Sequence, residues 1–285
     1  FQALEVWIGA DGRSGIYDRF LGQNAGDWFN LINQGIVRTG VANSDTHDRR
    51  ITYLATRNLI ASAETDPGNL SVLAEQLAAT VAAGKVAGSN GPFMTIEATA
   101  SMFGVTRMAG LGVNQSTTVS VGSGNSAMLK VTLSTPAWAA LDAVDFYVNN
   151  QPQLTTPSGE AARYGICANY TVSAGDEGWG STDVIVLEGV QGASRTDITV
   201  LLRLPEVTVD TWVVAVARGT DGVSEPMFPV VPEDLARESN QTLADLTDGN
   251  LDEEGMLAFA FTNPLFLDAG GNGWVAPGVA NASCP

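Results

Sequence analysis

The sequence predicts an α/β region followed by an all-β region. In residues 1–100, short apolar strands alternate with segments of helical periodicity. From residue 101 to residue 230, short strands follow one another between Gly, Asn, Asp and Pro residues. Strands that alternate with helices are typical of a parallel sheet or barrel, and a run of short strands is typical of a β-sandwich. We therefore expect an α/β region over 1–100, a β-sandwich accessory domain over 101–230 and an acidic tail over 231–285.

Apolar spacing places the elements of the α/β region. Trp28, Phe29 and Ile32 recur at helical spacing, and Gly35 follows at a position where glycine commonly ends a helix. A second helix is expected from Ser71, which is a good N-cap residue. The full set expected here is strands over residues 3–8 and 36–42 and helices over residues 24–33 and 71–85.

The later regions carry alternating strands and a separate apolar run. The expected strands cover residues 117–121, 128–132, 144–148, 184–186, 198–202 and 213–217. Four aromatic residues are expected in the sandwich core rather than on a carbohydrate-binding surface: Trp138, Phe146, Tyr147 and Trp212. In the tail, the apolar run 257–267 is expected to dock on one of the domains as an added strand.

The charge balance restricts the partners. The chain has 285 residues, with 14 Lys and Arg against 31 Asp and Glu, which gives a net charge of −17. Nucleic acids and anionic membranes bind clustered cations, so this balance argues against both as partners. We also expect no membrane span, because no apolar stretch approaches the ~20 residues that a spanning helix needs.

Cys167 and Cys284 are the only cysteines. Two cysteines in an acidic chain with few lysines suit an exported protein with one disulfide, and two unrelated free thiols are the alternative. We expect a secreted, periplasmic or cell-surface protein. The chain begins at Phe1 with a segment typical of a strand from the middle of a domain, and no signal-peptide pattern follows. We therefore expect it to be a piece of something longer.

The only histidine, His47, follows Asp45 in the segment 41–47 (VANSDTH). Asp-x-His is a metal-ligand spacing, since residues two apart on a strand point to the same face. The alternative is an Asx-turn formed by Asp45, with His47 as an ordinary loop residue. One histidine and one carboxylate are fewer than the three protein ligands of a typical catalytic zinc site.

Several segments resemble one enzyme family. Residues 27–35 (DWFNLINQG) and 39–47 (TGVANSDTH) resemble the last metal-ligand segment of PHP-domain metallohydrolases, the polymerase and histidinol phosphatase superfamily. The most similar branch is the CehA/McbA type. Residues 1–9 and 84–93 (GKVAGSNGPF) agree with further segments of that branch, and residues 261–268 (FTNPLFLD) resemble its closing segment.

The resemblance implies the last βα units of a distorted (β/α)7 barrel, which holds divalent ions (Zn, Mn or Fe) at the carboxyl ends of its strands. It implies that Asp45 and His47 are the final metal ligands and the catalytic residues, and that Glu5 and Asn43 lie near the pocket. The implied reaction is hydrolysis of a small-molecule ester or phosphoester by metal-bound water. The first ligands of the family lie upstream of the segment that begins this chain, so the missing N-terminal part of the same protein is an expected partner.

Two acidic loops offer candidate calcium ligands. Asp248, Asn250 and Asp252 put oxygen atoms at alternate positions, and Asp268 opens a degenerate calcium loop in which Gly270 replaces a ligand. For both, a plain loop is the preferred interpretation, because each lacks residues that a calcium loop needs.

Two functions from different classes stay open. The first is the C-terminal part of an exported metal-dependent hydrolase. The second is a catalytically incomplete structural or adhesive protein of the cell surface or extracellular space, in which a PHP-derived fold and a β-sandwich support self-assembly. A third, a calcium-stabilised module that binds glycans, rests on the acidic loops and the sandwich alone.

Overall fold

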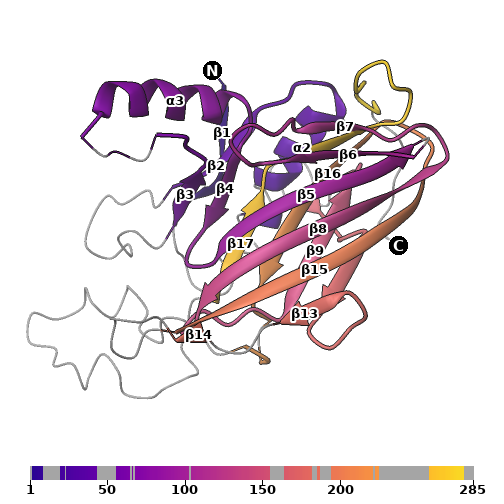
Figure 1. The fold of residues 1–285 in the computed structure, drawn as a ribbon. Helices are drawn as coiled ribbons and strands as arrows, with labels where there is room; N and C mark the ends of the chain where they lie inside the picture. Colours follow the sequence, from indigo (N-terminus) through magenta and orange to yellow (C-terminus); the bar gives the residue numbers. More distant parts are fainter. Residues whose placement is uncertain are drawn as a thin grey trace, which may run out of the picture.

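The computed structural model is mostly β, with few helices (Figure 1). It describes residues 2–8, 20–22, 24–43, 56–64, 66, 68–102, 104–154, 164–181, 185–186, 194–220, 222–224 and 257–278. The helices in these ranges are α2 (Ala25–Asn33) and α3 (Leu70–Ala82). Most strands belong to two sheets, and within the described ranges no sheet closes into a barrel.

The six-stranded sheet is antiparallel throughout. Its main path is β13 (Trp179–Ser181), β15 (Ser194–Val207), β8 (Asn125–Pro136), β5 (Phe93–Met102) and β6 (Val105–Gly110), and β14 (Ile185–Val186) also pairs with β15. Along β5, Met94, Ile96 and Ala98 are buried while the residues between them are more exposed. Because side chains alternate across a strand, one face of this sheet packs on the core and the other faces outward.

The eight-stranded sheet forms the middle of the molecule. Its main path is β12 (Tyr170–Ser173), β9 (Ala143–Val148), β16 (Thr211–Arg218), β17 (Phe259–Thr262), β4 (Val86–Ser89) and β3 (Arg57–Ile60), with β18 (Leu265–Asp268) and β7 (Thr118–Ser120) attached through β16. Seven consecutive residues of β16 are buried, so this strand is covered on both faces. On one face Trp212 packs on Phe29 of α2, at 4.9 Å between ring centroids, and Figure 1 shows the six-stranded sheet as a separate layer.

The eight-stranded sheet takes strands from all three regions expected from the sequence. β3 and β4 come from the first region, β9 and β16 from the second, and β17 and β18 from the tail. The apolar run 257–267 contributes two strands instead of one, and β17 lies between β16 and β4 inside the sheet. Because every residue of β17 and β18 is buried, this run is part of the central core.

A parallel βαβ unit precedes this sheet in the chain. β1 (Ala3–Ile8) and β2 (Thr39–Asn43) pair in parallel, and α2 connects them. Aromatic rings hold the unit on the eight-stranded sheet. Trp7 contacts Phe259 at 4.6 Å, and Trp28 contacts Phe261 at 6.0 Å, both edge to face. A small antiparallel pair, β10 (Gln153–Leu154) with β11 (Tyr164–Gly165), lies outside both large sheets.

One strand and one helix have boundaries that differ from those expected. β2 begins at Thr39 instead of at Ile36. Ile36 and Val37, expected to be buried in the strand, precede it and are 41% and 38% exposed. The second helix follows Asn69, so Ser71 lies inside the helix instead of capping it, and the helix ends at Ala82 instead of at residue 85.

Trp138 also differs from the expectation. Phe146, Tyr147 and Trp212 are buried as expected, but Trp138 is 54% exposed. It lies in the turn after β8, where the alternation of a strand no longer decides which side chains face the core.

Candidate functional site

Two asparagine side chains join β2 to the eight-stranded sheet. Oδ1 of Asn263 accepts a hydrogen bond from the N–H of Gly40 at 2.7 Å, and its Nδ2 donates to the Gly40 carbonyl at 2.9 Å. Asn58 of β3 makes the same pair of hydrogen bonds with Ala42, at 2.8 and 2.7 Å. A primary amide offers a donor and an acceptor like those of a peptide group, so each side chain replaces one rung of a strand ladder.

These contacts show that β4 runs in the same direction as β2. Nδ2 of Asn263 also donates to the carbonyl of Val86 at 2.9 Å, and the backbone of Asn58 is in register with Gly88. Residues 86 and 88 of β4 therefore lie beside residues 40 and 42 of β2. Since β1 is parallel to β2, the carboxyl ends of all three strands lie at one edge.

Glu5 and Asn43 meet near this edge. Nδ2 of Asn43 donates a hydrogen bond to Oε1 of Glu5 at 2.5 Å, and both side chains are exposed. The register of β1 and β2 shifts between Glu5 and Trp7, and such an irregularity redirects side chains locally. The two residues expected near a pocket are thus brought together.

The expected metal ligands follow directly in the sequence. Asn43 ends β2, and Asp45 and His47 come two and four residues later, outside the described residues. Across the described ranges, no group of three or more His, Cys, Asp and Glu side chains could hold a metal ion. The metal site at Asp45 and His47 therefore stays a prediction.

Arg57 adds a cation to the same edge. It is the first residue of β3, it is in register with Ser89 at the end of β4, and its Nη2 donates to the carbonyl of Asn90 at 3.3 Å. The edge thus combines a carboxylate, a carboxamide and a guanidinium. Such a set can bind a polar or anionic group of a small molecule by charge-assisted hydrogen bonds.

Sequence reasoning missed the asparagines that support this edge, of which Asn90 and Asn263 are buried and Asn58 is partly buried. Besides Asn58 and Asn263, Asn90 accepts from the N–H of Phe259 and donates to the carbonyl of Leu257, both at 2.8 Å. The available signal was an asparagine inside or directly after an apolar strand, where it needs hydrogen-bond partners if it is buried.

The candidate calcium ligands do not form a cluster in the described part of the chain. Asp248, Asn250 and Asp252 lie outside it. The carboxylate of Asp268 accepts hydrogen bonds from the N–H groups of Gly271 and Gly273, at 2.6 and 2.9 Å. Both of its oxygen atoms therefore hold the loop that follows, in keeping with the glycine-rich turn preferred from the sequence.

Asp210 completes this loop anchor. Its two oxygen atoms accept from the N–H groups of Ala269 and Val275, at 2.8 and 2.7 Å. Together with Asp268, it binds every second amide between residues 269 and 275. All four oxygen atoms of these two carboxylates accept backbone hydrogen bonds and so stabilise the loop conformation. The sequence of the loop alone did not indicate the part played by Asp210.

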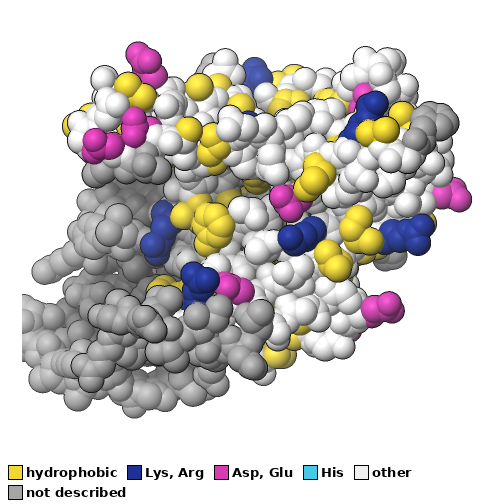
Figure 2. All heavy atoms as spheres, viewed as in Figure 1, with side chains coloured by type: hydrophobic (Ala, Val, Ile, Leu, Met, Phe, Trp, Pro, Cys, Tyr) yellow, Lys and Arg dark blue, Asp and Glu magenta, His cyan; other side chains and the backbone are white. Residues whose placement is uncertain are grey.

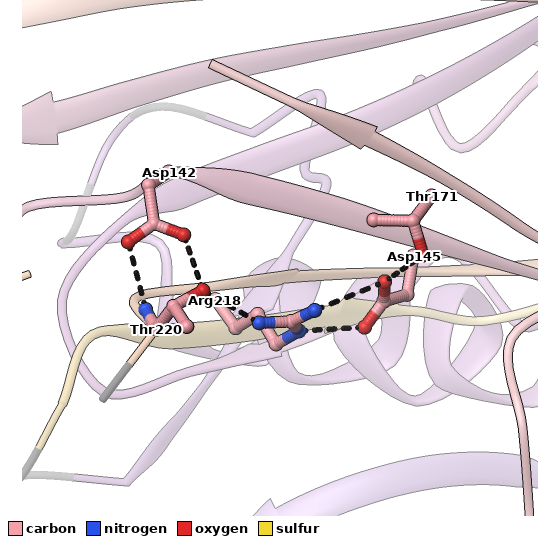
Figure 3. A network of polar contacts seen from close by, with 5 residues as sticks. All are labelled: Asp142, Asp145, Thr171, Arg218 and Thr220. Atoms are coloured by element: carbon pink, nitrogen blue, oxygen red, sulfur yellow. Dashed lines mark hydrogen bonds and ion pairs between the residues drawn. The ribbon is translucent and has the colours of Figure 1, made fainter. Parts of the chain in front are cut away.

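A second polar network lies at the end of β16 (Figure 3). Nε of Arg218 donates to Oδ2 of Asp145 at 2.7 Å, and Thr171 donates to the other oxygen of Asp145 at 2.6 Å. Nη1 of Arg218 donates to the hydroxyl of Thr220, which in turn donates to Asp142 at 2.5 Å. These side chains supply hydrogen-bond partners for one another at the end of the strand, so we interpret the network as stabilising the fold.

Cys167 is in a disulfide. The sequence holds one other cysteine, Cys284, which lies outside the described residues. The carbonyl of Cys167 accepts a hydrogen bond from Nδ2 of Asn150 at 2.7 Å, so the disulfide-bonded residue is also fixed through its backbone. In the part of the chain that the structure describes, no helix is long and apolar enough to cross a membrane.

Comparison with known proteins gives no match: no family model, no curated protein and no solved structure matches the chain. The resemblance to PHP-domain hydrolases therefore rests on the sequence segments given above.

Proposed function

We propose that the chain is the C-terminal part of an exported metal-dependent hydrolase of the PHP-domain type. In this proposal β1, α2, β2, α3 and β4 are the last βα units of a (β/α)7 barrel, and the six-stranded sheet belongs to a β-sandwich accessory domain. The substrate is a small-molecule ester or phosphoester. The disulfide at Cys167 supports export, because disulfides persist in oxidising compartments.

One observation carries the proposal. β1, β2 and β4 end at one edge, with the Glu5–Asn43 pair beside it, and the chain leaves β2 two residues before Asp45. Parallel α/β barrels keep their functional groups at the carboxyl ends of their strands. Asn58 and Asn263 support this geometry by fixing Ala42 and Gly40 of β2 against the sheet.

The residues fit a divalent metal in type but not in number. Asp45 and His47 would hold it, and the missing N-terminal part of the protein would supply the other ligands. A zinc, manganese or iron ion bound there would lower the pKa of a bound water to ~7. Glu5, held by Asn43, and Arg57 would orient the polar group of the substrate at the rim.

The test uses the protein extended by its upstream segment. Asp45→Ala should abolish both metal-dependent ester or phosphoester hydrolysis and the binding of one metal equivalent. Glu75→Ala, an exposed carboxylate on α3, removes the same charge elsewhere and should change neither. Hydrolysis that persists in Asp45→Ala at the wild-type rate would refute the proposal.

A second candidate function is a structural or adhesive protein that has kept a hydrolase-derived fold. The observation in its favour is the outward face of the six-stranded sheet, which carries exposed apolar side chains, among them Met108 and Leu201. Elemental analysis of the natively purified protein distinguishes the two candidates. Zinc, manganese or iron near one equivalent favours the hydrolase, whereas absence of all three together with ordered self-assembly favours the structural protein.

A further inference from the structure

We infer that the outward face of the six-stranded sheet is the contact surface for a second copy of this chain. This outer sheet face consists of the outward residues of β5, β6, β8 and β15: Phe93, Thr95, Glu97, Thr99, Ser101, Thr106, Met108, Ser126, Met128, Lys130, Thr132, Ser134, Arg195, Asp197, Thr199, Leu201 and Arg203. The inference is independent of the metal site and would supply the contact on which the second candidate function depends.

The outer sheet face carries exposed apolar side chains among polar and charged ones. Met108, Met128 and Leu201 are 52%, 39% and 43% exposed. Thr99 lies between the two methionines, because it is in register with Met108 on one side and with Met128 on the other. Leu201 is in register with Lys130, and Arg203 lies opposite Met128, so the three apolar side chains are distributed over four strands among polar and charged ones. Exposed apolar groups gathered on one face of a protein can mark an interaction site.

The charges of the outer sheet face nearly cancel, unlike those of the whole chain. Lys130 pairs with Glu97 at 3.8 Å and Arg195 with Asp197 at 3.2 Å, which leaves Arg203. Three cations and two carboxylates give this face a net charge of +1, against −17 for the chain. Figure 2 looks onto the face, where the visible surface is mostly uncharged and apolar side chains stand beside dark-blue cations.

This charge distribution favours a second copy of the chain as the binding partner at this face. Two molecules that each carry −17 repel one another, and the repulsion is weakest where their near-neutral faces meet. A two-fold contact needs a self-complementary patch. The outer sheet face provides one, because its exposed Met and Leu side chains can meet their own equivalents and its charges are of both signs, paired as Lys130 with Glu97 and Arg195 with Asp197.

The size of the face agrees with a stable dimer. The 12 residues of β8 span about 40 Å, and four adjacent strands span about 19 Å. Because β6 and β5 are shorter than β8, the face measures about 660 Å², within the range of about 600 to 1,000 Å² per partner of a standard protein interface. The antiparallel sheet is a regular element, so two copies can meet without rearrangement of the backbone.

The experiment is sedimentation equilibrium of the full chain and of matched charge variants. The wild type should dimerise at micromolar concentration. Leu201→Glu should raise the dissociation constant more than about tenfold, because a two-fold contact brings two new carboxylates together. Val223→Glu adds the same charge at an exposed position after β16, 72% exposed, and should leave the dissociation constant unchanged.

Salt dependence gives an independent readout. Raising NaCl from about 0.05 to about 0.5 M should tighten the dimer, because salt screens the repulsion between two acidic copies and leaves apolar contact intact. Circular dichroism of Leu201→Glu should match the wild type, which separates loss of contact from loss of fold. A wild type that stays monomeric up to about 100 µM overturns the inference. A dimer that Leu201→Glu and Met128→Glu do not weaken also overturns it, and either result leaves the metal-site proposal untouched.

Discussion

The side-chain amide of Asn263 forms hydrogen bonds with both the N–H and the carbonyl of Gly40, which lies 223 residues away in the sequence. Asn263 and Gly40 thereby join the tail of the chain to the strand that leads into the predicted metal-ligand segment. Gly40 suits this contact because a Cβ there would come within 2.8 Å of the Trp28 ring. The geometry of the candidate site thus depends on a residue from the opposite end of the chain.

Asn263→Ala should lower the free energy of unfolding by about 2 to 4 kcal/mol. The substitution leaves the N–H and carbonyl of Gly40 and the carbonyl of Val86 buried without this partner. Urea denaturation measures the change, with Asn272→Ala, in an exposed loop, as the control. Equal stability of the two variants would contradict the role given to Asn263.

Gly88→Ala should destabilise the protein by about 1 to 3 kcal/mol. A Cβ at Gly88 would overlap the ring of Phe261 on the neighbouring strand β17, so the aromatic core would have to shift. Gly180→Ala is the matched control, because its Cβ would have as nearest neighbour the carbonyl oxygen of Thr199, at 3.6 Å. Thermal unfolding of the two variants should differ clearly, and similar melting temperatures would disprove this packing argument.

Arg218→Met should lower the free energy of unfolding by about 3 kcal/mol, because it leaves the buried carboxylate of Asp145 without its cation. The double variant Arg218→Met/Asp145→Asn should regain part of that loss. Arg195→Met, in the more exposed pair with Asp197, should cost less than about 1 kcal/mol. Additive effects in the Arg218 and Asp145 cycle would show that the two side chains do not interact.

Tyr164 should make stability depend on alkaline pH. Its hydroxyl donates to Oδ1 of Asp27 at 2.6 Å, and this hydrogen bond, burial and the charge of Asp27 raise its pKa above the usual 10.0. A raised folded-state pKa favours the protonated form, so its contribution is full below pH 10 and is lost as pH rises through the raised value. Tyr164→Phe should remove this fall in stability, as measured by urea unfolding between about pH 8 and pH 11.5. An unchanged alkaline profile in Tyr164→Phe would assign the fall to other groups.

Local pattern was enough to predict much of the secondary structure. The strand over residues 3–8 and the helix that ends before Gly35 are confirmed, because apolar spacing and a glycine at positive φ act within a few residues. The expected strands at 128–132, 198–202 and 213–217 lie within β8, β15 and β16. The expectation of a core position failed at Trp138, which lies in a turn and is exposed.

Long-range contacts could not be predicted in this way. Apolar content marked the run 257–267 as buried, but its place between β16 and β4 depends on strands from two other regions. The pairing of Glu5 with Asn43 also needed the register of β1 against β2, including the shift after Glu5. Nothing local in the sequence fixes either arrangement.

The sequence by itself determined the strongly acidic charge, the alternation of buried and exposed residues along the strands, and the preference for a glycine-rich turn after Asp268. The tertiary structure decided that regions from both ends of the chain share one sheet, and that the side chains of Asn58 and Asn263 join β2 to it. The physical reason is the range of the interactions. Alternation and turn formation are properties of neighbouring residues, whereas a buried amide such as that of Asn263 is stable only where a distant backbone supplies its hydrogen-bond partners.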